Sequence, residues 1–151
     1  MPERKTLARA AADKRQGKAA STQAGEFLRE EMHHIRAGKH GARSTKQAIA
    51  IGLSKARRAG VHLKPPGKGA ASAKTRASAK RAYQAGHDGA DKPVSARRSR
   101  AVTRALEREP HAPASRTALS KQAKSAARKR SPPVRFAAAR KAARTRARHG
   151  S

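Results

Sequence analysis

The sequence predicts a mostly α-helical chain with extensive disorder, in which a short helical hairpin at about residues 22–60 is the folded part. Three observations lead to this prediction. The 151 residues carry 38 Lys and Arg against 9 Asp and Glu, a net charge of +29. Only 15 residues are Leu, Ile, Val or Phe, and a chain so poor in large apolar side chains and so highly charged rarely buries enough surface to fold throughout. Half of the 18 apolar residues other than Ala lie between residues 27 and 63.

The first helix of the expected hairpin follows apolar residues that recur three and four positions apart, which is the spacing of one helical face. Ser21 or Thr22 is expected to cap its start, and Gly38 to end it. The residues of this face are Ala24, Phe27, Leu28, Met32 and Ile35.

The second helix is expected to begin at Ser44, because Gln47 three residues later completes a capping box. Gly60 is expected to end it. A unit this small usually needs a further stabilising contact, so the hairpin is expected to form a homodimer, pack on another helix or order on binding. Its apolar face consists of Ala48, Ile49, Gly52, Leu53 and Ala56.

The whole chain is expected to divide into a basic N-terminal arm (1–20), the hairpin module (21–63), a Pro/Gly linker (64–69) and a basic low-complexity tail (70–151). From residue 64 onward there are 24 basic and 4 acidic side chains. Ala, Arg and Lys favour helix, and helical units are expected at 96–107, 116–130 and 134–148. Repulsion between like charges should leave these units as coil or transient helix.

Several classes of protein are excluded by composition. No cysteine is present, so disulfides and thiolate metal sites are absent. No apolar run approaches the length that spans a bilayer. We expect no secretory signal, because the basic first residues lead into alanines and charges and not into an apolar stretch. We therefore expect a cytoplasmic, nucleoid-located protein without stable membrane insertion. No plausible nucleophile or carboxylate pair supports an enzyme, and no cofactor is expected.

Two pairs of residues, Glu30 with His33 and Glu31 with His34, have the spacing found in di-iron helical bundles. The second helix of the expected hairpin, residues 47–56, adds neither a carboxylate nor an imidazole. The interpretation is a solvated polar face, and no metal ligand is predicted.

The charge predicts binding of a polyanion, with duplex DNA favoured over RNA, by neutralisation of phosphates without sequence specificity. With three aromatic residues in the chain, stacking platforms for bases are lacking. Glycines and cations around the loop 38–46 could also hold a phosphate at the start of the second helix. The predicted phosphate contacts are Lys39, Arg43, Lys46, Arg57, Arg58, Arg97, Arg98, Arg100, Arg128, Lys129, Arg130, Arg140, Lys141, Arg144, Arg146 and Arg148.

The expected function is that of a nucleoid-associated or DNA-condensing accessory protein. Two alternatives remain open. The same charge suits an RNA- or ribosome-associated protein, and sequence alone does not separate the two nucleic acids. In the other alternative the hairpin recruits a protein partner or partner helix, and the basic tail serves as an anchor.

Residues 21–63 resemble a small bacterial family of uncharacterised basic proteins. The resemblance rests on STQAGEF (21–27), EEMHH (30–34) and GKHGARSTKQAIAIGLSKARRAG (38–60). The tail is similar in composition to the Lys/Ala-rich termini of linker-histone-like bacterial nucleoid proteins. The first resemblance implies no established activity, although such proteins are often described as possible DNA-binding proteins. Neither resemblance implies catalytic residues.

Overall fold

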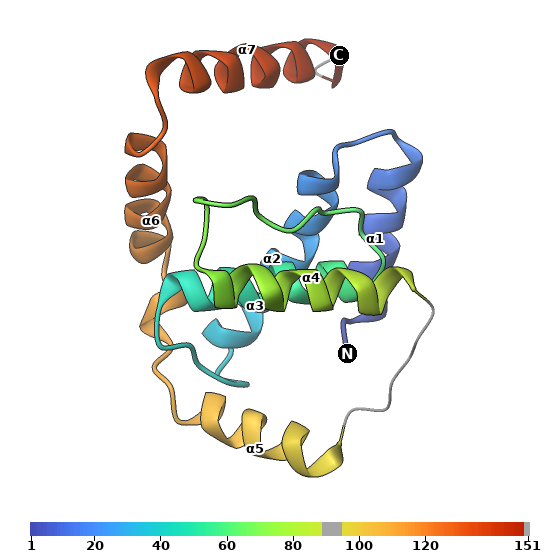
Figure 1. Cartoon of the computed structure of the whole chain (residues 1–151), viewed down its shortest axis with the longest axis vertical. Coiled ribbons are helices and arrows are strands. Elements are labelled where there is room, and N and C mark those ends of the chain that lie inside the picture. Colours follow the sequence, from blue (N-terminus) through green and yellow to red (C-terminus); the bar gives the residue numbers. More distant parts are fainter. Residues whose placement is uncertain (89–94, 150–151) are drawn as a thin grey trace. The chain divides into compact units, whose positions relative to one another are not determined.

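The computed structural model describes residues 1–88 and 95–149 of the chain. Its described part contains seven α-helices and one 3-10 turn, and 73% of the chain is helical (Figure 1). The elements are α1 (Arg4–Arg15), α2 (Ala20–Arg36), α3 (Thr45–Arg58), α4 (Ala73–His87), α5 (Ala96–Glu107), η1 (Ala112–Ala114), α6 (Arg116–Arg128) and α7 (Pro132–His149). Two units are distinguished, an N-terminal unit (Met1–Ser115) and a C-terminal unit (Arg116–Ser151).

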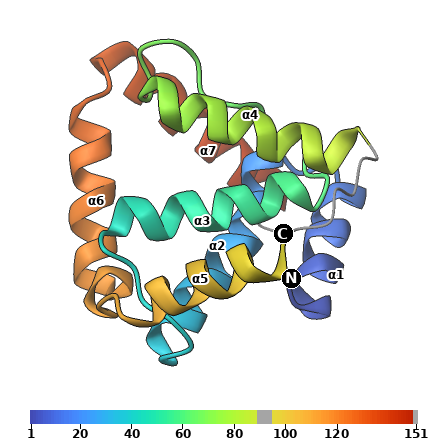
Figure 2. The same ribbon diagram turned by 60° about the horizontal axis from the view of Figure 1, so that its bottom comes forward.

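The N-terminal unit is built around α2 and α3, which pack on each other. Helix α1 packs on α2, helix α4 on α3, and η1 contacts both central helices. In Figures 1 and 2, α4 lies beside α3 and runs in the same direction, because residues 59–72 return the chain to the start of α3. The partner that so small a hairpin needs is therefore supplied by other helices of the same chain.

Alanine makes up most of the core of this unit. Eight of the twelve buried apolar residues are Ala, and the largest fully buried side chains are those of Phe27, Ile35 and Glu31. Small side chains let helix backbones approach closely. At Gly52 in α3, an added Cβ would lie 3.1 Å from the Cα of Leu28 in α2, so the glycine is part of the same close packing.

The expectation of extensive disorder, with the basic Ala-rich segments as coil or transient helix, is wrong. The expected units at 96–107, 116–130 and 134–148 correspond to the helices α5, α6 and α7. The error has a physical cause. Only large apolar residues were counted as core material, whereas closely packed helices bury Ala at positions such as Ala10, Ala79 and Ala82, outside the expected hairpin.

Both helices of the expected hairpin are present, and three of the four residues expected to mark their ends do so. The Ser44 hydroxyl accepts a hydrogen bond from the Gln47 amide (3.2 Å). Gly38 and Gly60 follow the two helices with φ of 74° and 82°, a conformation that glycine adopts without steric cost. The predicted start of the first helix is wrong, because Ala19 is the N-cap residue and Ser21 and Thr22 lie inside the first turn.

The C-terminal unit contains α6 and α7, which residues 129–131 connect. Neither helix has a buried residue in its described part. Their formation follows from the high helix propensity of Ala, Arg and Lys, and Ser131 precedes the Pro-Pro start of α7, where proline is well tolerated. No helix in the described part of the chain is both long and apolar enough to cross a membrane.

Candidate nucleic-acid interface and a carboxylate–histidine cluster

The acidic residues of the chain are concentrated where the first three helices meet. Among residues 1–88 and 95–149, both members of every ion pair belong to the segment 3–55. The carboxylates in these pairs belong to Glu3, Asp13, Glu26, Glu30 and Glu31. The N-terminal unit thus neutralises part of its own charge internally.

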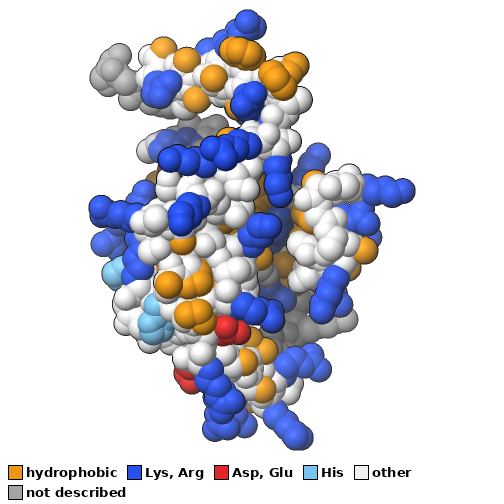
Figure 3. Space-filling view, turned by 90° about the vertical axis from the view of Figure 1, so that its left-hand side faces the viewer, with side chains coloured by type: hydrophobic (Ala, Val, Ile, Leu, Met, Phe, Trp, Pro, Cys, Tyr) orange, Lys and Arg blue, Asp and Glu red, His pale blue; other side chains and the backbone are white. Residues whose placement is uncertain are grey.

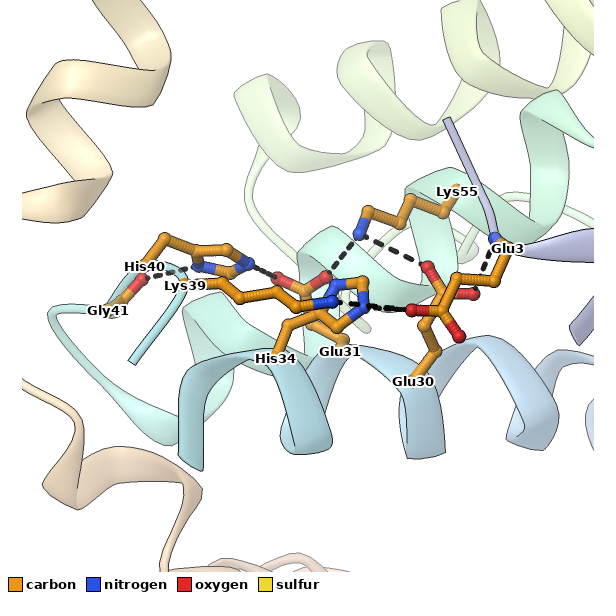
Figure 4. Close-up of polar contacts among 8 residues, drawn as sticks. All are labelled: Glu3, Glu30, Glu31, His34, Lys39, His40, Gly41 and Lys55. Carbon is orange, nitrogen blue, oxygen red and sulfur yellow. Dashed lines mark hydrogen bonds and ion pairs between the residues drawn. The ribbon is translucent and has the colours of Figure 1, made fainter. Parts of the chain in front are cut away.

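Two adjacent carboxylates of α2 are buried beside a lysine of α3 (Figure 4). Lys55 places its Nζ 2.7 Å from Glu31 Oε2 and 3.7 Å from Glu30 Oε1. Glu30 Oε2 accepts a hydrogen bond from the backbone amide of Glu3 (3.0 Å), directly before α1. Burying a charge is costly unless it is paired, and the pairing here joins α1, α2 and α3.

Two histidines extend this cluster toward the loop after α2. His34 Nε2 lies 2.8 Å from Glu3 Oε1, and His40 Nε2 lies 3.4 Å from Glu31 Oε1. The ring of His34 lies between the carboxylates of Glu3 and Glu31 (Figure 4). The hydrogen bond from His34, with a further contribution from Lys39, lowers the pKa of the Glu3 carboxyl, which therefore stays ionised and able to accept.

The expectation of a solvated polar face is wrong for Glu30 and Glu31, which are 5% and 0% exposed. A signal was present in the sequence. Glu31 lies four residues from both Phe27 and Ile35, in the middle of the apolar face of α2. His33, by contrast, is exposed. The further polar groups come from His40 in the loop and Glu3 before α1, neither of which lies on the second helix of the hairpin.

The loop expected to hold a phosphate is largely occupied by the chain itself. The amides of Gly41 and Ala42 donate to the carbonyls of Leu106 and Pro110 at 2.8 and 3.0 Å. An added Cβ at Gly41 would collide with the carbonyl of Glu109, so the glycine permits close docking of this segment. The loop therefore serves as a packing surface, although the side chains of Arg43 and Lys46 stay exposed.

Two of the predicted phosphate contacts are engaged elsewhere. Arg57 is 7% exposed, and its guanidinium donates to the carbonyls of Leu63 (3.0 Å) and Lys64 (3.5 Å). Desolvation by burial lowers its pKa, and its contacts hold the segment after α3 in place. Lys39 lies 3.4 Å from Glu3 Oε1 but remains exposed.

The remaining predicted contacts are all exposed. They are Arg58 at the end of α3, Arg97, Arg98 and Arg100 on α5, Arg128, Lys129 and Arg130 at the end of α6, and Arg140, Lys141, Arg144, Arg146 and Arg148 on α7. Among the side chains visible in Figure 3, Lys and Arg are numerous and few are acidic.

One basic surface was predicted only in part, since Arg128 and Lys129 were expected contacts and Lys121 and Lys124 were not. A shallow depression on α6 is lined by Lys121, Lys124, Ser125, Arg128 and Lys129. Lys121, Lys124 and Arg128 are spaced three and four residues apart, which places them on one side of the helix. The helical spacing of the cations, rather than their number, was the available signal.

Comparison with known proteins assigns no activity. Residues 12–69 match a family of unknown function (DUF6496). The matched segment includes α2, α3 and the loop between them. It therefore contains every member of the carboxylate–histidine cluster except Glu3, namely Glu30, Glu31, His34, Lys39, His40 and Lys55. It also includes the residues on which the resemblance to an uncharacterised family rests. No curated protein and no solved structure was found to match the chain.

Proposed function

We propose that the chain binds nucleic acid, duplex DNA in preference to RNA, through its phosphates and without reading sequence. Its role would be that of a nucleoid-associated or DNA-condensing accessory protein. The observation that carries the proposal is the C-terminal unit, in which twelve Lys and Arg stand without any Asp or Glu. Such a surface attracts polyanions, and each phosphate it neutralises releases counterions.

The distribution of acidic residues supports the same proposal. The ion pairs of the described residues are confined to α1, α2 and α3 with their flanking residues. The cations of α6 therefore have no carboxylate to displace before they meet a phosphate. Four of them, Lys121, Lys124, Arg128 and Lys129, lie close together around one depression, as a backbone-contacting helix requires.

The aromatic residues favour contact with the phosphate backbone over contact with bases. Phe27 is buried in the N-terminal unit, and Tyr83 is stacked on His87 with ring centroids 3.9 Å apart. Phe136 is 67% exposed and is the remaining aromatic side chain of the three. One ring is a poor platform for stacking several bases.

The test is a fluorescence-anisotropy titration of the full-length chain against a short labelled duplex between about 50 and 200 mM salt. The logarithm of the affinity should fall steeply with the logarithm of salt concentration, by about 0.9 for each phosphate neutralised. Replacing Lys121, Lys124, Arg128 and Lys129 together with Gln should lower this slope by about 3.6. A slope near zero for the unchanged chain would contradict the proposal.

The matched control removes the same charge from the N-terminal unit. Arg4, Lys5, Lys14 and Arg15 are exposed on α1, and replacing these four with Gln should change the slope by less than half as much. Equal effects of the two variants would show that binding depends on total charge and that α6 forms no interface. Competition by duplex RNA at lower concentration than by duplex DNA would reverse the stated preference between the two nucleic acids.

A further inference from the structure

The carboxylate–histidine cluster brings three potential ligands for a metal ion, one carboxylate and two imidazoles, to one place. Glu31, His34 and His40 each offer one atom, and these atoms lie within 4.8 Å of one another. Glu31 is fully buried, and its Oε1 accepts no hydrogen bond from the described residues. The neighbour of that oxygen is His40 Nε2 at 3.4 Å.

The hydrogen bonds of the two rings fix which nitrogen is free. His40 Nδ1 lies 3.1 Å from the carbonyl oxygen of Gly41. Since a carbonyl only accepts, Nδ1 carries the proton, and a neutral ring then presents the lone pair of Nε2 to Glu31. His34 Nε2 donates to the ionised Glu3, which leaves a lone pair on the second nitrogen of that ring.

A lone pair of His40 therefore faces a lone pair of Glu31, and a cation between them is required. That cation is either a proton on the ring or a metal ion. The separation of 3.4 Å is longer than a charge-assisted hydrogen bond of about 2.7–2.9 Å. It is close to the distance of about 3.3 Å between two ligands in a tetrahedral zinc site with bonds near 2.0–2.1 Å.

The local charge also suits a divalent cation, although the chain as a whole is strongly basic. Around the cluster stand the carboxylates of Glu3, Glu30 and Glu31 and the ammonium groups of Lys39 and Lys55. Negative charge is thus in excess here. Lys55 contacts Oε2 of Glu31, so Oε1 remains available to a metal without loss of that ion pair.

We propose that Glu31, His34 and His40 form a binding site for Zn²⁺ or a similar divalent transition metal. Two imidazoles and one carboxylate form a ligand set that zinc accepts, with a fourth position left for water or a further oxygen. Glu3 and the Gly41 carbonyl accept hydrogen bonds from the two rings and so orient them, as outer partners of metal-bound histidines do.

A metal at this site would fasten the loop after α2 to the body of the N-terminal unit. His40 belongs to this loop, His34 and Glu31 belong to α2, and Glu3 precedes α1. The same loop docks on residues 106–110 through Gly41 and Ala42. Metal binding would therefore stabilise the junction of four segments, and this proposal does not depend on nucleic-acid binding.

The test is calorimetric titration of Zn²⁺ into the full-length, nucleic-acid-free chain. We expect binding at one site, and His34→Ala and His40→Ala should each weaken it at least about tenfold. The matched control is His33→Ala, because His33 lies beside His34 on α2 but is exposed; it should change the affinity less than about twofold. Loss of affinity in His33→Ala equal to that in His34→Ala would overturn the site.

A second measurement keeps the proposal testable if a variant fails to fold. Ring-nitrogen NMR of the unchanged chain should show that Zn²⁺ shifts the signals of His34 and His40 before those of His33. The chain offers a competing pair, since His87 Nε2 lies 3.0 Å from His62 Nδ1. If Zn²⁺ moved the signals of His62 and His87 alone, the metal would be bound there and the proposed site would be wrong.

Discussion

The two units are made of the same kind of sequence and use it in opposite ways. In the N-terminal unit, Ala residues such as Ala24 and Ala56 are buried where helices meet. In the C-terminal unit, Ala137 and Ala142 are exposed, and α7 has no buried residue in its described part. Alanine is thus core material where another helix approaches and only a helix former where none does.

The acidic residues are distributed as unevenly between the two units as the buried alanines. All nine lie in the N-terminal unit, and five of them pair with cations near the junction of α1, α2 and α3. Paired charges help the basic helices α1 and α3 to pack on α2, which carries three of the carboxylates, whereas α6 and α7 carry cations and no carboxylate side chain. The carboxylates therefore help α1 and α3 to pack on α2, whereas α4, which has no Asp or Glu, packs on α3 without an ion pair in the described part of the chain.

The two phenylalanines of the chain provide the largest test of this comparison, because each unit contains one. Phe27 is 1% exposed and Phe136 is 67% exposed. Phe27→Ala should lower the free energy of unfolding by about 3–5 kcal/mol, the usual cost of such a cavity. Phe136→Ala should change it by no more than about 0.5 kcal/mol.

Urea denaturation followed by circular dichroism measures both variants under the same conditions. A loss for Phe136→Ala comparable to that for Phe27→Ala would show that the C-terminal unit has a core of its own. The contrast between the two units would then be wrong.

The sequence predicts those structural features that are determined by residues close together in the chain. The ends of α2 and α3 are local features, and Gly38, Ser44 and Gly60 predict them correctly. The apolar face of α2 follows from spacing alone. The fold class was wrong because close packing of small residues, as between Gly52 and Leu28, leaves no mark in a count of large apolar side chains.

The carboxylate–histidine cluster shows a different limit. Glu31 lies within the apolar face of α2, so its burial could have been predicted. Its partner Lys55 could not have been, since it lies 24 residues away along the chain. Neither could Glu3, which contacts Glu30 and His34 from 27 and 31 residues away. Only the packing of α1 and α3 on α2 brings them together.

Two helical glycines give a test of intermediate size within the N-terminal unit. At Gly52 an added Cβ would lie 3.1 Å from Leu28 Cα, whereas at Gly25 nothing lies within 4 Å. Gly52→Ala should therefore destabilise the chain by about 1–3 kcal/mol through overpacking. Gly25→Ala should stabilise it by about 0.5–1 kcal/mol, since Ala loses less backbone entropy in a helix.

The opposite signs of these two changes make thermal or urea unfolding a sharp measurement. If Gly52→Ala were stabilising as well, α2 and α3 would not be in the close contact on which the Ala-rich core depends. A destabilising Gly25→Ala would instead indicate that a neighbour covers the exposed side of α2.

The smallest expected effect concerns the link between α1 and α2 at Glu3. The hydrogen bond from His34 lowers the pKa of this carboxyl in the folded chain below its ordinary value of 4.5. Its contribution to stability is therefore fully present above about pH 4.5 and is lost as the pH falls through the lower, folded-state pKa. Glu3→Gln should lower the melting temperature at pH 6 and lose this effect in more acidic solution.

The control for Glu3 is the same substitution made in a His34→Ala background. Removing His34 abolishes the largest cause of the pKa shift, so the pH-dependent difference between Glu and Gln at position 3 should shrink. An undiminished difference would mean that Lys39, and not His34, lowers the pKa of Glu3. Because the C-terminal unit has no Asp or Glu, acid-dependent loss of structure should begin where the first three helices meet, and α6 and α7 have no acidic side chain to titrate.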